Sequence, residues 1–191
     1  VLIRDACVID PAFRPLIIAG GPLVNYEPWG AFIGDARDPW SADVAVTGEE
    51  FVLLSLLEIL LSERAADESL RATFLRARDA GILDSVPGLV FARMQRDGSI
   101  ESLVDTGVQR LLGDLDELPH PVHGYRLLEP PGRRTTLASQ ALPADRVKRY
   151  SPIGSLVMTF GCKFACAYCP IPAYNQRQYR VKSGERIADE F

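Results

Sequence analysis

Residues 162–169 have the sequence Cys162-Lys-Phe-Ala-Cys166-Ala-Tyr168-Cys169, which holds three of the four cysteines in this chain of 191 residues. Such clustering favours a metal site over two disulfide bridges. A short loop can offer several thiolates to one iron–sulfur cluster when their spacing suits its corners. Three thiolates leave one iron of a four-iron cluster open, so that a chelating molecule can bind there, as at catalytic zinc sites. The loop therefore predicts a redox cofactor site.

Other ligands and another metal stay open from the residues alone. Zinc prefers four ligands, and neither cysteine nor histidine follows Cys169. Cys7 is either a small buried side chain or a fourth ligand. His120 and His123 lie in a proline-rich segment, either as solvated linker residues or as metal ligands. The clustered cysteines favour iron and sulfide over these alternatives.

The loop resembles the signature of the radical S-adenosylmethionine superfamily, Cys-x-x-x-Cys-x-aromatic-Cys, with Tyr168 at the aromatic position. In that family the loop follows the first strand of a partial TIM-type barrel, and residues 154–160 have strand character. The resemblance implies a 4Fe–4S cluster on Cys162, Cys166 and Cys169, with S-adenosylmethionine on the open iron close to Tyr168. It also implies a reductant such as flavodoxin or ferredoxin, whose electron cleaves the sulfonium to a 5′-deoxyadenosyl radical. It assigns no catalytic residue.

The first hundred residues have the alternation of an α/β domain. Residues 16–19 and 43–46 predict short buried strands, the first ended by the turn Gly20-Gly21-Pro22. Thr47-Gly48-Glu49-Glu50 has the spacing of a capping box. We therefore expect a helix over residues 51–64, largely buried because its polar residues are few.

Further local signals lie downstream. A second helix is expected over residues 67–80, with Gly81 as its stop. An Asp-Gly turn between residues 88–93 and 99–103 predicts a β-hairpin. Ser183 is a predicted N-cap for a helix that runs to the end of the chain.

Residues 16–121 are similar to the second half of the cobalamin-binding domain that precedes the barrel in one branch of the radical S-adenosylmethionine superfamily. Four segments carry this resemblance: Gly20-Gly21-Pro22, Thr47-Gly48-Glu49-Glu50, Val86-Pro87-Gly88-Leu89 and Asp114-Leu115-Asp116-Glu117-Leu118-Pro119. It implies a Rossmann-like, doubly wound α/β fold in which Gly20 and Gly21 approach the nucleotide tail of cobalamin. An ordinary tight turn explains the two glycines equally well.

These observations predict that the chain divides into three segments. Residues 1–112 form the second half of a cobalamin-binding-like Rossmann domain with a hairpin, residues 113–152 a proline-rich connector, and residues 153–191 the start of a radical S-adenosylmethionine barrel. Only 22 residues follow Cys169, whereas a full barrel takes about 200 residues or more. The Asp-x-His-x-x-Gly segment that supplies a cobalt ligand in many cobalamin domains would precede residue 1. We therefore expect a fragment whose first barrel strand has no neighbouring strand.

The net charge and the apolar pattern exclude some classes of binding partner. A net charge of −4 argues against a broad basic surface for nucleic acid or anionic lipid. The longest apolar run, residues 51–61, is too short for a membrane span and contains Glu58. With no secretory leader in view, we expect a cytoplasmic protein.

The favoured function is a cobalamin-dependent radical enzyme that transfers methyl groups to unactivated carbon or performs a related rearrangement. Two alternatives stay open, a radical S-adenosylmethionine enzyme that does not use cobalamin and a non-catalytic iron–sulfur or zinc module. The substrate would be selected by barrel strands that this sequence does not contain.

Overall fold

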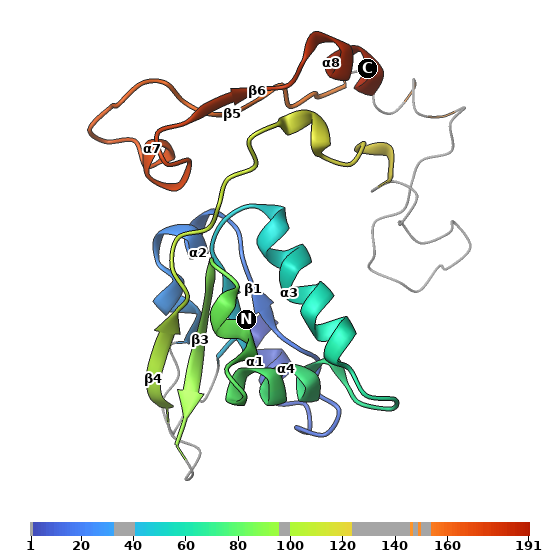
Figure 1. The fold of residues 1–191 in the computed structure, drawn as a ribbon, viewed down its shortest axis with the longest axis vertical. Helices are drawn as coiled ribbons and strands as arrows, with labels where there is room; N and C mark the ends of the chain where they lie inside the picture. The colour runs from blue at the N-terminus through green and yellow to red at the C-terminus, as the bar shows by residue number, and fades with distance from the viewer. Residues whose placement is uncertain (1, 33–40, 96–99, 124–145, 147–148, 150–153) are drawn as a thin grey trace. The chain divides into compact units, whose positions relative to one another are not determined.

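The computed structural model describes residues 2–32, 41–95, 100–123, 146, 149 and 154–191 (Figure 1). The chain divides into two compact units, Val1–Leu112 and Gly113–Phe191. Each unit is described by itself below. In the part of the chain that is described, no helix has the length and apolar character needed to cross a membrane.

The first unit is built on a four-stranded mixed sheet in the order β1-β2-β3-β4. Its strands are β1 (Ile18–Ala19), β2 (Val44–Val46), β3 (Leu89–Met94) and β4 (Ile100–Asp105). β1 is parallel to β2, whereas the β2–β3 and β3–β4 pairs are antiparallel. The α/β class, both short strands and the hairpin are thus confirmed, but the sheet is mixed.

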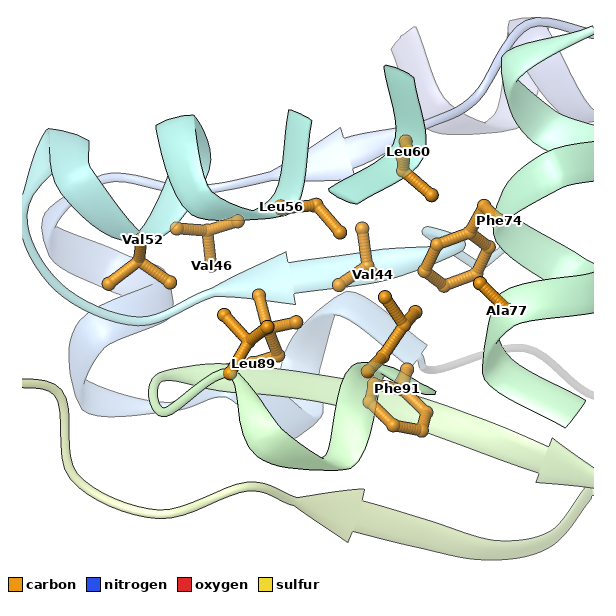
Figure 2. Close-up of a cluster of buried hydrophobic side chains, with 11 residues drawn as sticks. Val44, Val46, Val52, Leu56, Leu60, Phe74, Ala77, Leu89 and Phe91 are labelled. Carbon is orange, nitrogen blue, oxygen red and sulfur yellow. The ribbon is translucent and has the colours of Figure 1, made fainter. Parts of the chain in front are cut away.

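Helices cover both faces of this sheet because side chains alternate along each strand. On one face Val44, Val46, Leu89 and Phe91 pack against α3 (Glu50–Glu63) and α4 (Leu70–Asp79), as Figure 2 shows. On the other face Ala45 and Val90 pack against Ala31 and Phe32 of η1 (Pro28–Phe32). The remaining helices of the unit are short: α1 (Leu2–Cys7), α2 (Pro22–Tyr26) and η2 (Ile82–Ser85).

The predicted capping box at the start of α3 is wrong. The helix begins at Glu50, and its N-cap residue Glu49 makes no capping hydrogen bond through its side chain. Thr47 instead joins two strand ends, because its N–H and its hydroxyl both donate to the Gly88 carbonyl, at 2.8 and 3.0 Å. A tertiary partner has replaced the local one.

The burial of α3 also differs from the prediction. Val52, Leu56 and Leu60 form a buried stripe toward the sheet. Leu54 and Leu61 are 52% and 61% exposed. The helix is therefore buried along one side and not largely buried, since these leucines point away from the sheet.

α4 confirms the second predicted helix with a later start. Ser69 is its N-cap and accepts a hydrogen bond from the Ala72 N–H at 3.1 Å. Asp67, the predicted first residue, has a φ of 65° and lies outside the helix. Gly81 follows the helix with a φ of 74°, a conformation that glycine adopts without strain, so the predicted stop is confirmed.

The second unit contains η3 (Leu115–Glu117), β5 (Thr159–Gly161), α7 (Ile171–Tyr174), β6 (Tyr179–Val181) and α8 (Gly184–Glu190). β5 and β6 form an antiparallel two-stranded sheet. The strand predicted over residues 154–160 is thus shorter, and the expectation that it lacks a neighbour is wrong. The backbone groups of β5 are instead hydrogen-bonded to those of β6.

α8 confirms the last predicted helix, because Ser183 is its N-cap and accepts from the Arg186 N–H at 3.0 Å. The start of the helix is fastened to the beginning of the unit, where the Ser183 N–H donates to Asp116 at 2.9 Å and Arg186 donates to the Leu118 carbonyl at 2.7 Å. Hydrogen bonds from Ser183 lower the pKa of Asp116. Most of the predicted proline-rich connector beyond residue 123 lies outside the described residues.

Candidate functional site

The cysteine loop, residues 162–178, joins β5 to β6. Gly161 at the end of β5 pairs with Tyr179 at the start of β6. The loop therefore leaves and returns at the same point of the sheet, and Cys162 is the first residue after the strand.

The three cysteines are free thiols near the surface. Cys162 and Cys169 are half-buried and Cys166 is exposed. The Phe164 N–H donates to the Cys162 sulfur at 3.5 Å, and the Cys169 N–H donates to the Cys166 carbonyl at 3.1 Å. Tyr168 projects outward with 90% of its surface exposed. These thiols are open to an incoming metal cluster.

The donor set has the chemistry for an iron–sulfur cluster, because three unpaired thiols within one loop are the ligands that such clusters use. Their arrangement is open, however. Within the described residues no three side chains of His, Cys, Asp or Glu are gathered so that they could hold a metal ion. Cluster binding would thus require the loop to draw its sulfurs together.

The base of the cysteine loop is tightly packed. We use this name for Phe160, Gly161, Asn175, Gln178 and Arg180. Gly161 has a φ of 84°, and a Cβ atom there would collide with the Gln178 carbonyl oxygen. Glycine is therefore required directly before the first cysteine. The contact between Gly161 and Gln178 could not be read from the sequence, because the two residues lie on opposite sides of the loop.

Arg180 on β6 completes this base. It is 7% exposed, and its Nη2 donates to Oδ1 of Asn175 at 3.1 Å. Its guanidinium lies 6.0 Å from the centre of the Phe160 ring. Asn175 is itself 3% exposed and its side-chain amide donates to the Ile171 carbonyl at 3.4 Å. Sequence reasoning missed Arg180, because its contact with Phe160 joins residues on opposite sides of the whole loop.

A second polar cluster anchors α8 to the end of β6. The side chain of Glu190 is 1% exposed and accepts from Lys182 Nζ at 2.6 and 2.8 Å and from Arg186 Nε at 2.7 Å. The hydrogen bond from Lys182, with a further one from Arg186, lowers the pKa of Glu190 despite its burial. Only the spacing of Arg186 and Glu190, four residues apart on a helix, could have signalled this cluster.

A candidate ligand-binding edge lies in the first unit, where β1 and β2 end side by side. Gly20 and Gly21 follow β1, and Gly21 has a φ of 93°. A Cβ atom at Gly21 would meet nothing within 4 Å, and one at Gly20 only the Val46 carbonyl at 3.8 Å. This turn therefore leaves open space at the carboxyl ends of parallel strands, where α/β folds bind ligands.

The neighbouring turn after β2 is closed by the protein itself. A Cβ atom at Gly48 would collide with the Gln109 side chain. Gln109 accepts from the Glu49 N–H at 2.9 Å, and Asn25 accepts from the Gly48 N–H at 2.7 Å. Of the two glycine turns at this edge, only the Gly20-Gly21 turn has room for a ligand. Sequence reasoning missed both amide side chains.

The remaining candidates, Cys7, His120 and His123, have partners other than the three cysteines. Cys7 belongs to the first unit, where its thiol donates to the Ser41 carbonyl at 3.7 Å. His120 Nε2 lies 3.2 Å from the Asp189 carbonyl oxygen, and its ring centre is 6.4 Å from that of His123. None of them joins a group of three potential ligands among the described residues.

The chain is similar to hopanoid C-3 methylase from Methylococcus capsulatus, with 27% identity over 172 residues. The match covers 81% of this chain but only 33% of the relative, so the chain spans about a third of that protein. No protein-family model and no solved structure matches the chain. This distant similarity confirms the resemblance drawn from the cysteine loop and the preceding domain.

Proposed function

We propose that the chain is part of a radical S-adenosylmethionine enzyme that methylates an unactivated carbon. The observation that carries the proposal is the loop of three free thiols between β5 and β6. The similarity to a methylase whose name specifies a carbon position, C-3 of a hopanoid, supports methyl transfer to carbon. The substrate of this chain is not assigned by that name.

In this proposal Cys162, Cys166 and Cys169 hold a 4Fe–4S cluster and leave one iron for S-adenosylmethionine. When bound, the cluster supplies the electron that cleaves the cofactor's sulfonium. The exposed ring of Tyr168 stands next to Cys169, where it is available to cover the bound cofactor. The loop has to draw the three thiols together for the cluster to bind, because they are not gathered in the described residues.

We also propose that the first unit binds cobalamin as the methyl carrier. The open Gly20-Gly21 turn supports this, since a ligand can approach the backbone there without meeting a side chain. Leu23, Tyr26 and Trp29 follow in α2 and η1 and are 75%, 42% and 45% exposed. Neighbouring exposed apolar side chains often mark a binding surface.

The domain plan follows from these two sites. Residues 1–112 are proposed as the second half of a doubly wound cobalamin-binding domain, residues 113–152 as a connector and residues 153–191 as the start of the barrel. Productive cleavage needs groups that orient the sulfonium and ribose, and a misplacement of about 1 Å costs roughly 100-fold in rate. We therefore expect turnover only with the later barrel strands present.

Anaerobic reconstitution with iron and sulfide tests the cluster. Cys162→Ala, Cys166→Ala and Cys169→Ala should each abolish the cluster, as measured by bound iron and sulfide. Cys7→Ser is the matched control and should retain it, because Cys7 lies in the other unit. Unchanged iron and sulfide in Cys166→Ala would contradict the proposal, and zinc bound in place of iron would favour a zinc module.

Equilibrium dialysis with hydroxocobalamin tests the second site. Gly20→Val should weaken binding by about tenfold or more, since the added side chain fills the open turn. Gly113→Val adds the same bulk at a glycine that also has open space around it and should change nothing. Equal affinity in both variants, or no binding to the original chain, would favour an enzyme that does not use cobalamin.

A further inference from the structure

We infer that Arg180 is a positioning residue for the cysteine loop, holding both ends of the loop so that its three thiols can converge on one cluster. This inference rests on the proposed cluster function and deepens it. Arg180 is not itself among the thiol ligands.

The two partners of Arg180 lie on either side of the three cysteines. Phe160 lies two residues before Cys162, and Asn175 lies six residues after Cys169. Arg180 contacts the ring of the first and the side-chain oxygen of the second. One side chain thus ties together the segments on both sides of the cysteines.

Burying the Arg180 guanidinium costs free energy. A guanidinium stays charged in proteins, and burying a charge is unfavourable unless hydrogen bonds and aromatic faces compensate for the lost water. Arg180 is 7% exposed, although its neighbours in β6, Tyr179 and Val181, are 49% and 52% exposed. The strand therefore turns its charged residue inward and its apolar residues outward, the reverse of the usual pattern. An inward charge at this place indicates a specific task.

The cysteine-bearing part of the loop is loosely arranged, whereas its base is tightly packed. Cys166 is exposed, Cys162 and Cys169 are half-buried, and no group of three potential ligands forms among the described residues. The base of the loop, in contrast, is packed by Gly161 against the Gln178 carbonyl. The entropy lost on closing a loop depends on how its ends are held. If the base is fixed in advance, cluster binding has to order only the residues between the ends. Arg180 thereby lowers the conformational cost of cluster binding.

The test compares Arg180→Met, Arg180→Lys and Asn175→Ala in the whole chain after anaerobic reconstitution. The readouts are the rate at which a chelator removes iron and the EPR line shape of the reduced cluster. Arg180→Met and Asn175→Ala should each lose iron about tenfold faster, the size expected for losing a buried hydrogen bond to a charged group. Arg180→Lys should fall in between, because a cation over the Phe160 ring is kept while the planar donor is lost.

Controls separate positioning from folding. Arg177→Ala removes an exposed guanidinium three residues away and should release iron at the original rate. The double variant Arg180→Met/Asn175→Ala should be no faster than the faster single variant if both act through one bond. Far-UV circular dichroism should stay unchanged; a fold lost only in Arg180→Met leaves Asn175→Ala to decide the matter.

The outcomes distinguish this inference from the proposed function. If the original chain binds a cluster but Arg180→Met and Asn175→Ala release iron at the original rate with unchanged EPR line shape, the positioning role is overturned and the cluster stands. If the original chain binds no iron–sulfur cluster, both fall together.

Discussion

Lys182 and Glu190 form a buried ion pair, with Nζ and a carboxylate oxygen 2.6 Å apart and side chains that are 5% and 1% exposed. The pair joins the residue after β6 to the last residue of α8. Removing one partner of a buried pair leaves the other charge uncompensated, which costs about 3–5 kcal/mol. The helix that follows the cysteine loop thus depends on a charge contact with the strand that closes the loop.

This pair predicts acid sensitivity of α8. The pKa of Glu190 is lowered in the folded chain, so the unfolded state binds more protons and the stabilisation is present above the ordinary carboxyl pKa. It should be lost as the pH falls through the folded pKa. Once exchange rates are corrected for the intrinsic pH dependence of amide exchange, the protection of residues 179–191 should therefore fall on acidification.

Glu190→Gln provides the matched experiment. It should speed exchange in these residues at neutral pH and remove most of the acid dependence. Glu185→Gln, at an exposed position of the same helix, should do neither. Acid dependence that persists fully in Glu190→Gln would contradict the assignment.

A second prediction concerns the two sides of α3. Leu56→Ala should destabilise the first unit by about 2–5 kcal/mol because its fully buried side chain leaves a cavity. Leu54→Ala, two residues away and 52% exposed, should change stability by no more than about 0.5 kcal/mol. Denaturant unfolding followed by the fluorescence of Trp29 and Trp40, which both belong to the first unit, measures the difference. Equal losses would mean that the helix is buried all round, as its sequence suggested.

A third prediction concerns Glu68 at the start of α4. Its hydrogen bond from Arg76, at 2.9 Å, and further ones from the Ala65 N–H and the Thr73 hydroxyl lower the pKa of Glu68 to about 2. The stabilisation from this carboxylate should be complete above its ordinary pKa of 4.5 and disappear as the pH falls toward 2.

Carbon-detected NMR titration should show the Glu68 carboxyl as one of the last to take up a proton. Arg76→Met should move its midpoint back toward 4.5, whereas Arg78→Met, which removes a cation paired with Asp79 instead, should not. A Glu68 midpoint near 4.5 in the original chain would show that the Arg76 contact does not form in solution.

The sequence predicted those elements whose ends are determined by residues close to them in the chain. α4 is bounded by Ser69 and Gly81, and the paired strands β3 and β4 are close in the sequence, so neighbouring residues carried the information. Thr47 shows the limit, because its hydroxyl could serve either a helix N-terminus or the Gly88 carbonyl. Sequence spacing alone does not decide between a local and a distant acceptor.

The three cysteines of the candidate site could be picked out from the sequence, whereas the residues that hold the base of the loop could not. The spacing of the three cysteines is visible in the sequence, and the cluster that it indicates stays a prediction. Arg180, in contrast, meets Phe160 because β6 returns beside β5, and that pairing follows from long-range packing. The turn at Gly20-Gly21 was expected, but its openness was not, because openness depends on whether a side chain distant in the sequence packs over the turn, as Gln109 does at Gly48.

The most direct test of the central claim is the EPR spectrum of the reconstituted, dithionite-reduced chain, recorded with and without S-adenosylmethionine. A 4Fe–4S cluster held by Cys162, Cys166 and Cys169 has an iron without a protein ligand, so adding S-adenosylmethionine should shift the spectrum. The shift should be absent in Cys166→Ala, which should carry no cluster. A cluster whose spectrum stays the same at saturating S-adenosylmethionine would contradict the account.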